Sequence, residues 1–155
     1  MASTQIDKSL ERRINQSVRT YNQGDPGYFD FFAKNASIFG TESSEPVRGR
    51  ENYRKNFEKL LTSGKRRMKI LRRDVQVVGT NVILSQTAQI TQTGVTANVR
   101  QSAIWGQEDG EWVIEHLHTA LIGAPIADKT PSAVREIRVL NERIATVAAV
   151  LGVAE

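Results

Sequence analysis

Four strand-length segments follow one another in the second half of this chain, and they constrain the fold more than any other feature. In each of them apolar and polar residues alternate with a period of two, which is the pattern of a half-buried strand. The segments are residues 68–78, 82–92, 95–106 and 111–122. Glycine-containing turns separate them, and glycine supplies the positive φ that tight hairpin turns require. We therefore predict a four-stranded antiparallel meander.

The first half of the chain reads as helices. Apolar residues recur at helical spacing over residues 4–23 and again over about 49–63. Between them Asp25 and Pro26 form an N-cap and first-turn proline pair, which starts a short aromatic helix. Residues 36–49 are expected to be irregular. Helices followed by a meander predict an α+β fold with the helices packed on one face of a curved sheet.

Composition excludes several classes of protein. The 155 residues contain no cysteine, so there is no disulfide framework, thiolate metal site or thiol nucleophile. No apolar run approaches the ~20 residues of a membrane helix, and we find no signal-peptide pattern. The net charge of +4 permits anionic partners without demanding them. We expect a cytoplasmic protein.

The last predicted strand holds both histidines of the chain, two residues apart. Strict alternation predicts two faces for it: Trp112, Ile114, His116 and His118 on one, and Val113, Glu115, Leu117 and Thr119 on the other. Two apolar residues followed by two imidazoles indicate a strand that runs from a packed core into a semi-polar cavity. His116 and His118 then either form an acid/base or ligand-holding pair, or complete a structural network with Gln101, Tyr21 or a backbone carbonyl.

Alternation on the neighbouring strands predicts further lining residues. Val99, Gln101, Ala103 and Trp105 share one face, and Thr87 and Gln89 share one on the strand before. Gln89, Gln101 and Trp105 would form a neutral pocket that suits an apolar or aromatic small molecule with a few polar groups. Trp105 is alternatively a plain core residue. Tyr21 either points its hydroxyl inward or closes the mouth of the cavity.

Other chemistry finds little support. We find no paired carboxylates, nucleophile elbow, phosphate-binding loop or third metal ligand, so we predict no cofactor and no metal site. The basic run over residues 65–73 has no interleaved aromatic residue. We interpret it as a charged, solvated strand edge and do not expect nucleic-acid binding, although an RNA-binding surface there stays a minor alternative.

The order of elements, with "NQGD" at 22–25, "VRGRENYRKNF" at 47–57 and "IWGQEDGEWVIEHLH" at 104–118, resembles the nuclear transport factor 2-like superfamily. Within it the chain is similar to SnoaL-like polyketide cyclases and to the association domain of calcium/calmodulin-dependent kinase II. The resemblance covers about residues 5–125. It implies a cone-shaped barrel, in which a strongly bent, mostly antiparallel sheet wraps around N-terminal helices and leaves a cavity at its open end.

Two departures from these relatives bear on function. Gln89, Ala103 and Thr119 stand where the association domain carries pocket arginines, so its anion-binding pocket is not carried over. In the cyclases an aspartate on the last strand acts as acid/base, and His118 stands at that position here. Histidine exchanges protons near neutral pH.

We therefore expect a nuclear transport factor 2-like domain over residues 1–125 and a C-terminal helical extension over residues 126–155. Outward-facing apolar residues predict self-association through the outer sheet face, as a homodimer or larger: Ile104, Val113, Leu117 and Leu121. The extension, with a heptad-like seam, docks on its own domain or on a partner. The leading hypothesis is a small-molecule-binding protein, or a cyclase/isomerase-type enzyme with His118 as acid/base. The alternative is a non-enzymatic assembly module.

Overall fold

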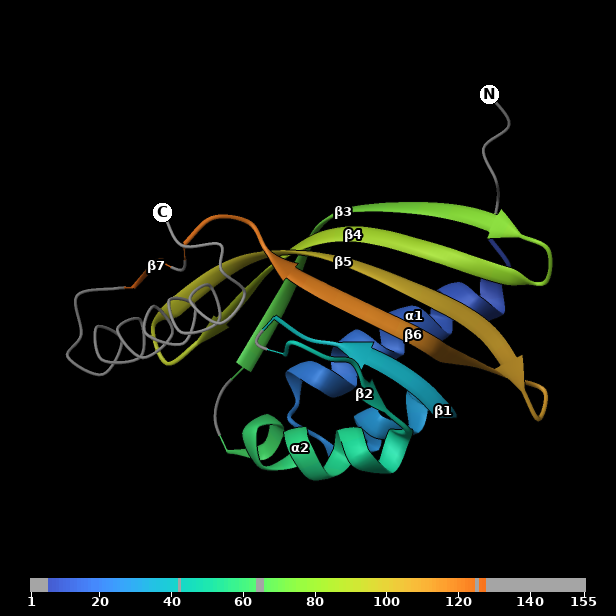
Figure 1. The fold of residues 1–155 in the computed structure, drawn as a ribbon. Helices are drawn as coiled ribbons and strands as arrows, with labels where there is room; N and C mark the ends of the chain where they lie inside the picture. Colours follow the sequence, from blue (N-terminus) through green and yellow to red (C-terminus); the bar gives the residue numbers. More distant parts are fainter. Residues whose placement is uncertain (1–5, 42, 64–65, 125, 128–155) are drawn as a thin grey trace.

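The computed structural model describes residues 6–41, 43–63, 66–124 and 126–127 (Figure 1). Its elements are α1 (Lys8–Asn22), the 3-10 helix η1 (Pro26–Phe31), β1 (Phe32–Phe39), β2 (Val47–Arg48), α2 (Arg50–Thr62), β3 (Arg66–Val78), β4 (Asn81–Gln92), β5 (Val95–Glu108), β6 (Glu111–Leu121) and β7 (Ile126–Ala127). The predicted helices and the four-stranded meander are confirmed. The rest of the predicted C-terminal extension lies outside the described residues.

The strands form one sheet in the order β2-β1-β6-β5-β4-β3, and β7 pairs with β5. Neighbours from β3 to β6 are antiparallel, whereas β1 runs parallel to β6. The prediction that residues 36–49 are irregular is wrong for β1 and β2. Strand β1 forms its hydrogen-bond ladder with β6, which lies more than seventy residues later in the chain. The local sequence pattern alone therefore does not reveal β1.

The helices lie against the concave face of this bent sheet (Figure 1). Asp7 caps α1 by accepting a hydrogen bond from the Ser9 backbone N–H (2.7 Å), and the helix buries Leu10, Ile14 and Tyr21. The α+β class with a curved, mostly antiparallel sheet around N-terminal helices is therefore confirmed. None of the described helices is long and apolar enough to cross a membrane.

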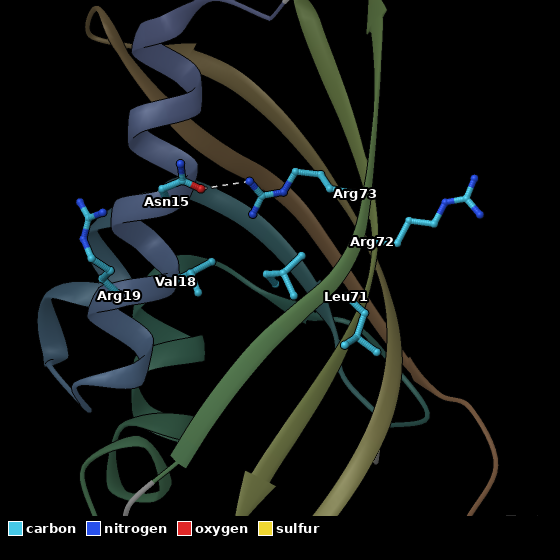
Figure 2. A pocket seen from close by; sticks show the side chains of 7 residues that line it. Asn15, Val18, Arg19, Leu71, Arg72 and Arg73 are labelled. Atoms are coloured by element: carbon cyan, nitrogen blue, oxygen red, sulfur yellow. Dashed lines mark hydrogen bonds between the residues drawn. The ribbon is translucent and has the colours of Figure 1, made fainter.

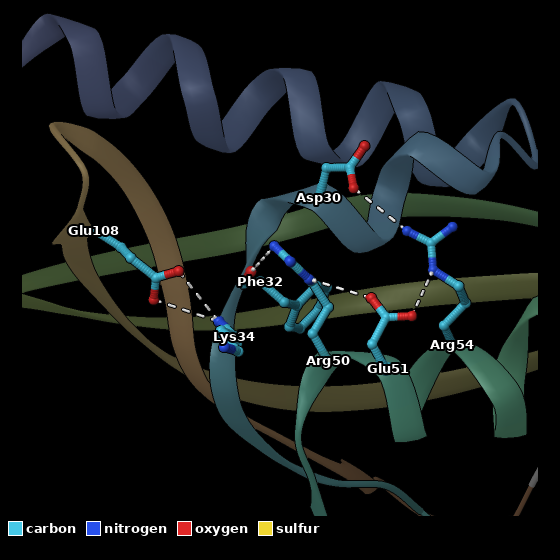
Figure 3. A network of polar contacts seen from close by, with 7 residues as sticks. All are labelled: Asp30, Phe32, Lys34, Arg50, Glu51, Arg54 and Glu108. Atoms are coloured by element: carbon cyan, nitrogen blue, oxygen red, sulfur yellow. Dashed lines mark hydrogen bonds and ion pairs between the residues drawn. The ribbon is translucent and has the colours of Figure 1, made fainter.

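An aromatic cluster joins η1 and α2 beneath the sheet. It consists of Tyr28, Phe29, Phe32, Tyr53 and Phe57, whose rings meet edge-to-face or stacked. Outside it, Arg54 of α2 pairs with Asp30 at 3.3 Å and with Glu51 at 3.8 Å (Figure 3). Both carboxylates are largely exposed, so each pair contributes only about 0–1 kcal/mol. The buried rings, rather than these ion pairs, hold α2 in place.

Two β-bulges set which side chains face inward. On β3, Ile70 pairs with Ala88 and Arg72 with Thr87, which leaves Leu71 as an extra residue. On β6, Ile114 pairs with Trp105 and His116 with Ile104, which leaves Glu115 as an extra residue. An extra residue shifts the two-residue alternation by one position, so every side chain after it changes face.

Candidate functional site

A row of polar side chains crosses the concave face, and we call it the polar row. It starts on α1, where Asn15 Oδ1 accepts from Arg73 Nη1 of β3 (3.0 Å). Arg73 Nε donates to Gln86 Oε1 of β4 (3.4 Å), and Gln86 Nε2 donates to Gln101 Oε1 of β5 (2.8 Å). Gln101 Nε2 then donates to Thr119 Oγ1 of β6 (3.1 Å). Five elements thus meet in one continuous hydrogen-bonded chain.

A cavity of about 40 Å³ lies beside this row, between α1 and the sheet. Its lining is mostly apolar and aromatic, with the amides of two glutamines: Ile14, Ser17, Val18, Tyr21, Tyr28, Met68, Leu84, Gln86, Gln101, Ala103, Trp105, Ile114 and Leu117. A water molecule needs roughly 10–15 Å³ of such volume. Organic ligands occupy pockets of about 300–1,000 Å³, so the cavity in this conformation is of water size.

Trp105 is the largest fully buried side chain of this lining, at 1% exposure. Its indole Nε1 has no hydrogen-bond partner among the described residues. Leaving a buried donor unpaired costs about 1–3 kcal/mol. One residue of the cavity lining thus carries a buried donor that has no acceptor among the described residues.

The tyrosines of the lining do not ionise near neutral pH. Burial raises the pKa of Tyr21, and it raises the pKa of Tyr28 well above the ordinary value. The Tyr21 hydroxyl accepts a hydrogen bond from Arg66 Nη1 at 3.2 Å. No carboxylate, histidine or lysine stands among the described lining residues. This cavity can therefore donate and accept hydrogen bonds, but it offers no general base at neutral pH.

A larger hollow, which we call the groove, lies between α1 and β3 (Figure 2). Its volume is about 490 Å³. Val18 lines both hollows, and the Arg73–Gln86 hydrogen bond joins a residue of the groove to a residue of the cavity. The two hollows are therefore neighbours separated by a few side chains.

The predicted inward position of the two histidines is wrong. His116 pairs with Ile104 and His118 with Ser102 on the face away from the helices, and neither lines the cavity. The bulge at Glu115 is the cause, because it leaves Ile114 inward but turns Leu117 inward in place of His116. His116 Nδ1 lies 2.6 Å from Ser37 Oγ of β1. His118 is exposed and its ring meets that of Phe39.

The other predicted lining residues divide between the two faces. Tyr21, Gln101 and Trp105 line the cavity. Gln89 does not, because it pairs with Asn98 and Lys69 on the outer face, and Gln86 takes the inward place. Gln86 was missed although a signal exists: it stands in the apolar alternation of Val82, Leu84, Ala88 and Ile90.

The predicted outer apolar face also needs correction. Leu117 lines the cavity, Leu121 pairs with inward-facing Val99, and Val113 is buried, which leaves Ile104 as the partly exposed residue of the four on the outer face. The basic run is divided too, since Arg67, Lys69 and Arg72 are exposed whereas Arg66 and Arg73 turn toward the helices.

Comparison with known structures supports the architecture. A nuclear transport factor 2-like protein from Pseudomonas putida is 13% identical, with 79% of this chain and 94% of that chain covered and a TM-score of 0.66. A protein from Xanthomonas campestris, provisionally described as a calcium/calmodulin-dependent protein kinase II association domain, is 17% identical over 79% and 91% of the chains, with a TM-score of 0.65.

A third structure, provisionally described as a scytalone dehydratase from Novosphingobium aromaticivorans, is 13% identical over 81% and 89% of the chains, with a TM-score of 0.65. At these identities the likeness shows the fold. No curated protein matches the sequence. The family model of the SnoaL-like domain matches residues 10–123, and the chain therefore belongs to the SnoaL-like domain family.

Proposed function

We propose that this protein binds a small organic molecule between α1 and the concave face of its sheet. The main evidence for this proposal is the polar row. Gln101 is only 8% exposed, and burying amides costs free energy that apolar side chains of similar size would not cost. A row that spans five elements and borders two hollows is better explained by a ligand than by stability.

The two hollows suggest how such a ligand would lie. The groove has a volume of about 490 Å³, which falls in the usual range of about 300–1,000 Å³ for organic ligands. The body of the ligand fits the groove. The neighbouring water-sized cavity would take one polar group of the ligand, since its lining includes Trp105, whose buried N–H has no partner among the described residues.

Binding is better supported than acid/base catalysis in this space. The described lining has no group that exchanges protons near neutral pH, and a proton-transfer role for His118 would have to serve a ligand on the outer face. The neighbour described as a dehydratase favours small-molecule chemistry in general. The site of this chain favours a binding role.

A neutral fluorescent probe tests the proposal. We expect N-phenyl-1-naphthylamine to bind the wild-type protein with enhanced emission, because its rings fit an apolar groove. Val18→Phe should weaken binding roughly tenfold or more, since Val18 lines both hollows and the larger ring would fill part of that space. Fluorescence titration measures both affinities.

Val78→Phe is the matched control, because Val78 lies at the exposed end of β3, remote from the groove lining. Melting curves of both variants establish that each is folded. Absence of probe binding to the wild type, or equal binding to the two variants, would refute a ligand site between α1 and the sheet.

We also propose self-association through the outer face as a second role. A strip without carboxylate, lysine or arginine crosses that face from β3 to β1, and we call it the neutral strip: Gln76, Ile83, Ile104, His116 and Ser37. Ile83 and Ile104 are paired neighbours and only half-buried in one protomer. A second copy would cover them. The neighbour described as an association domain is consistent with this role.

Sedimentation equilibrium checks this role. We expect the wild-type protein to dimerise at micromolar concentration and Ile104→Lys to be monomeric, because a charge in the centre of an apolar contact is costly to bury. Thr91→Lys, on the same face but outside the neutral strip, should still dimerise. A monomeric wild type would contradict the proposal.

A further inference from the structure

We propose that the ligand of the groove is an organic anion, with its anionic group on the Arg73 guanidinium and its apolar part over Val18 and Ile70. This inference rests on the proposed function, because it names the chemical class of ligand for that site. Support for it comes from the charge, the orientation and the neighbours of the Arg73 side chain (Figure 2).

Arg73 has no described carboxylate as a partner. Its two hydrogen bonds go to neutral amide oxygens, those of Asn15 (3.0 Å) and Gln86 (3.4 Å). None of the ion pairs formed by the described residues includes it. Glu11, one helical turn before Asn15, acts on the pKa of Arg73 only as a more distant charge, which raises it. A partly buried guanidinium of this kind is normally paired with an anion.

The half-buried position of Arg73 reduces the hydration of its guanidinium. Loss of hydration lowers the pKa of Arg73, although a guanidinium stays charged at any physiological pH. Reduced hydration strengthens attraction to an incoming anion, because the local dielectric is lower than in water. The cation is thus held in place by two amides and remains available for a ligand.

The bulge at Leu71 explains why Arg73 is the residue that faces the groove. Without the extra residue, alternation from Ile70 would bring Arg72 inward. With it, Ile70 and Arg73 share the inner face, and Arg72 points away from α1 (Figure 2). Arg19 on α1 also points away from the space between α1 and β3 (Figure 2). Arg19 and Arg72 also belong to the groove lining, but of the three guanidiniums only that of Arg73 points into the space between α1 and β3 (Figure 2). This arrangement suits a ligand with one anionic group.

The rest of the groove suits an apolar body. Val18 from α1 and Ile70 from β3 line it, and Val18 lies below the Asn15–Arg73 hydrogen bond in Figure 2. The volume of about 490 Å³ accommodates one or two fused or linked rings. A carboxylate, sulfonate or phosphate monoester on such a body would meet Arg73 in the fork geometry that guanidinium prefers.

Two probes with the same rings and different charge test the inference. 8-Anilinonaphthalene-1-sulfonate carries a sulfonate, and N-phenyl-1-naphthylamine has the same ring system without it. We expect the wild-type protein to bind the sulfonate probe roughly tenfold more tightly than the neutral one, as one charge-assisted hydrogen-bond pair would give. Added NaCl should weaken binding of the sulfonate probe alone.

Arg73→Gln should remove this preference, so that the sulfonate probe and the neutral probe bind the variant with similar affinity. Arg72→Gln is the matched control, with the same loss of charge on the side chain that points away; it should keep the preference. Arg73→Lys, which keeps the charge and loses the fork, should retain part of it. Should Arg73→Gln fail to fold, the Arg73→Lys comparison and the salt dependence decide the question.

Equal affinity of the wild type for both probes, or equal loss in Arg73→Gln and Arg72→Gln, overturns the anion site while leaving a neutral ligand site intact. Failure of both probes to bind refutes the proposed function itself. The two failures are therefore distinguishable.

Discussion

Trp105→Ala should lower the free energy of unfolding by about 3–5 kcal/mol, the usual cost of truncating a buried aromatic side chain. Trp105 is 1% exposed and forms a wall of the cavity under α1. Its removal would join a new void to the existing hollow of about 40 Å³. Urea unfolding followed by circular dichroism measures the change.

Two further experiments test whether the loss of stability comes from the lost side-chain volume. Trp105→Phe should cost less than half as much, because a ring remains and Nε1–H donates no hydrogen bond to a described residue that could be lost. Indole should raise the melting temperature of Trp105→Ala in a concentration-dependent manner by filling the void. If Trp105→Ala were as stable as the wild type, Trp105 would not be the core residue described here.

Phe29→Ala should also cost about 3–5 kcal/mol. Phe29 is fully buried, and its ring centroid lies 5.3 Å from that of Tyr53 and 5.6 Å from that of Tyr28. The Arg54 guanidinium carbon lies 5.2 Å from the same ring. Truncation therefore loosens α2 from η1, and hydrogen exchange of the α2 amides should rise together with the loss of global stability.

Phe39→Ala is the control for this substitution. Phe39 stands on the outer face, is only half-buried, and meets the ring of His118. Its loss should cost no more than about 1 kcal/mol, because little apolar area leaves the core. A comparable loss of stability in both variants would indicate that the outer face of the protein is as tightly covered as its core.

The regular elements of the protein were predictable because their signals are local. Glycine turns, an Asp25-Pro26 start and period-two alternation placed β3 to β6 within a few residues of their observed bounds. Strand β1 was not predictable in this way, because its hydrogen bonds come from β6 in a parallel pair. The inward face of β5, with Gln101 and Trp105, was also predictable, since that strand alternates without interruption up to Trp105.

The amino-acid order alone thus settles the α+β class, the meander and the identity of the amides and aromatics available to a site. Only the folded chain decides which of them meet. Single extra residues at Leu71 and Glu115 turn Arg73 inward and both histidines outward. A bulge arises from pairing between two strands, so that neither strand's own pattern contains it. For this protein the chemistry of the site depends on those two positions.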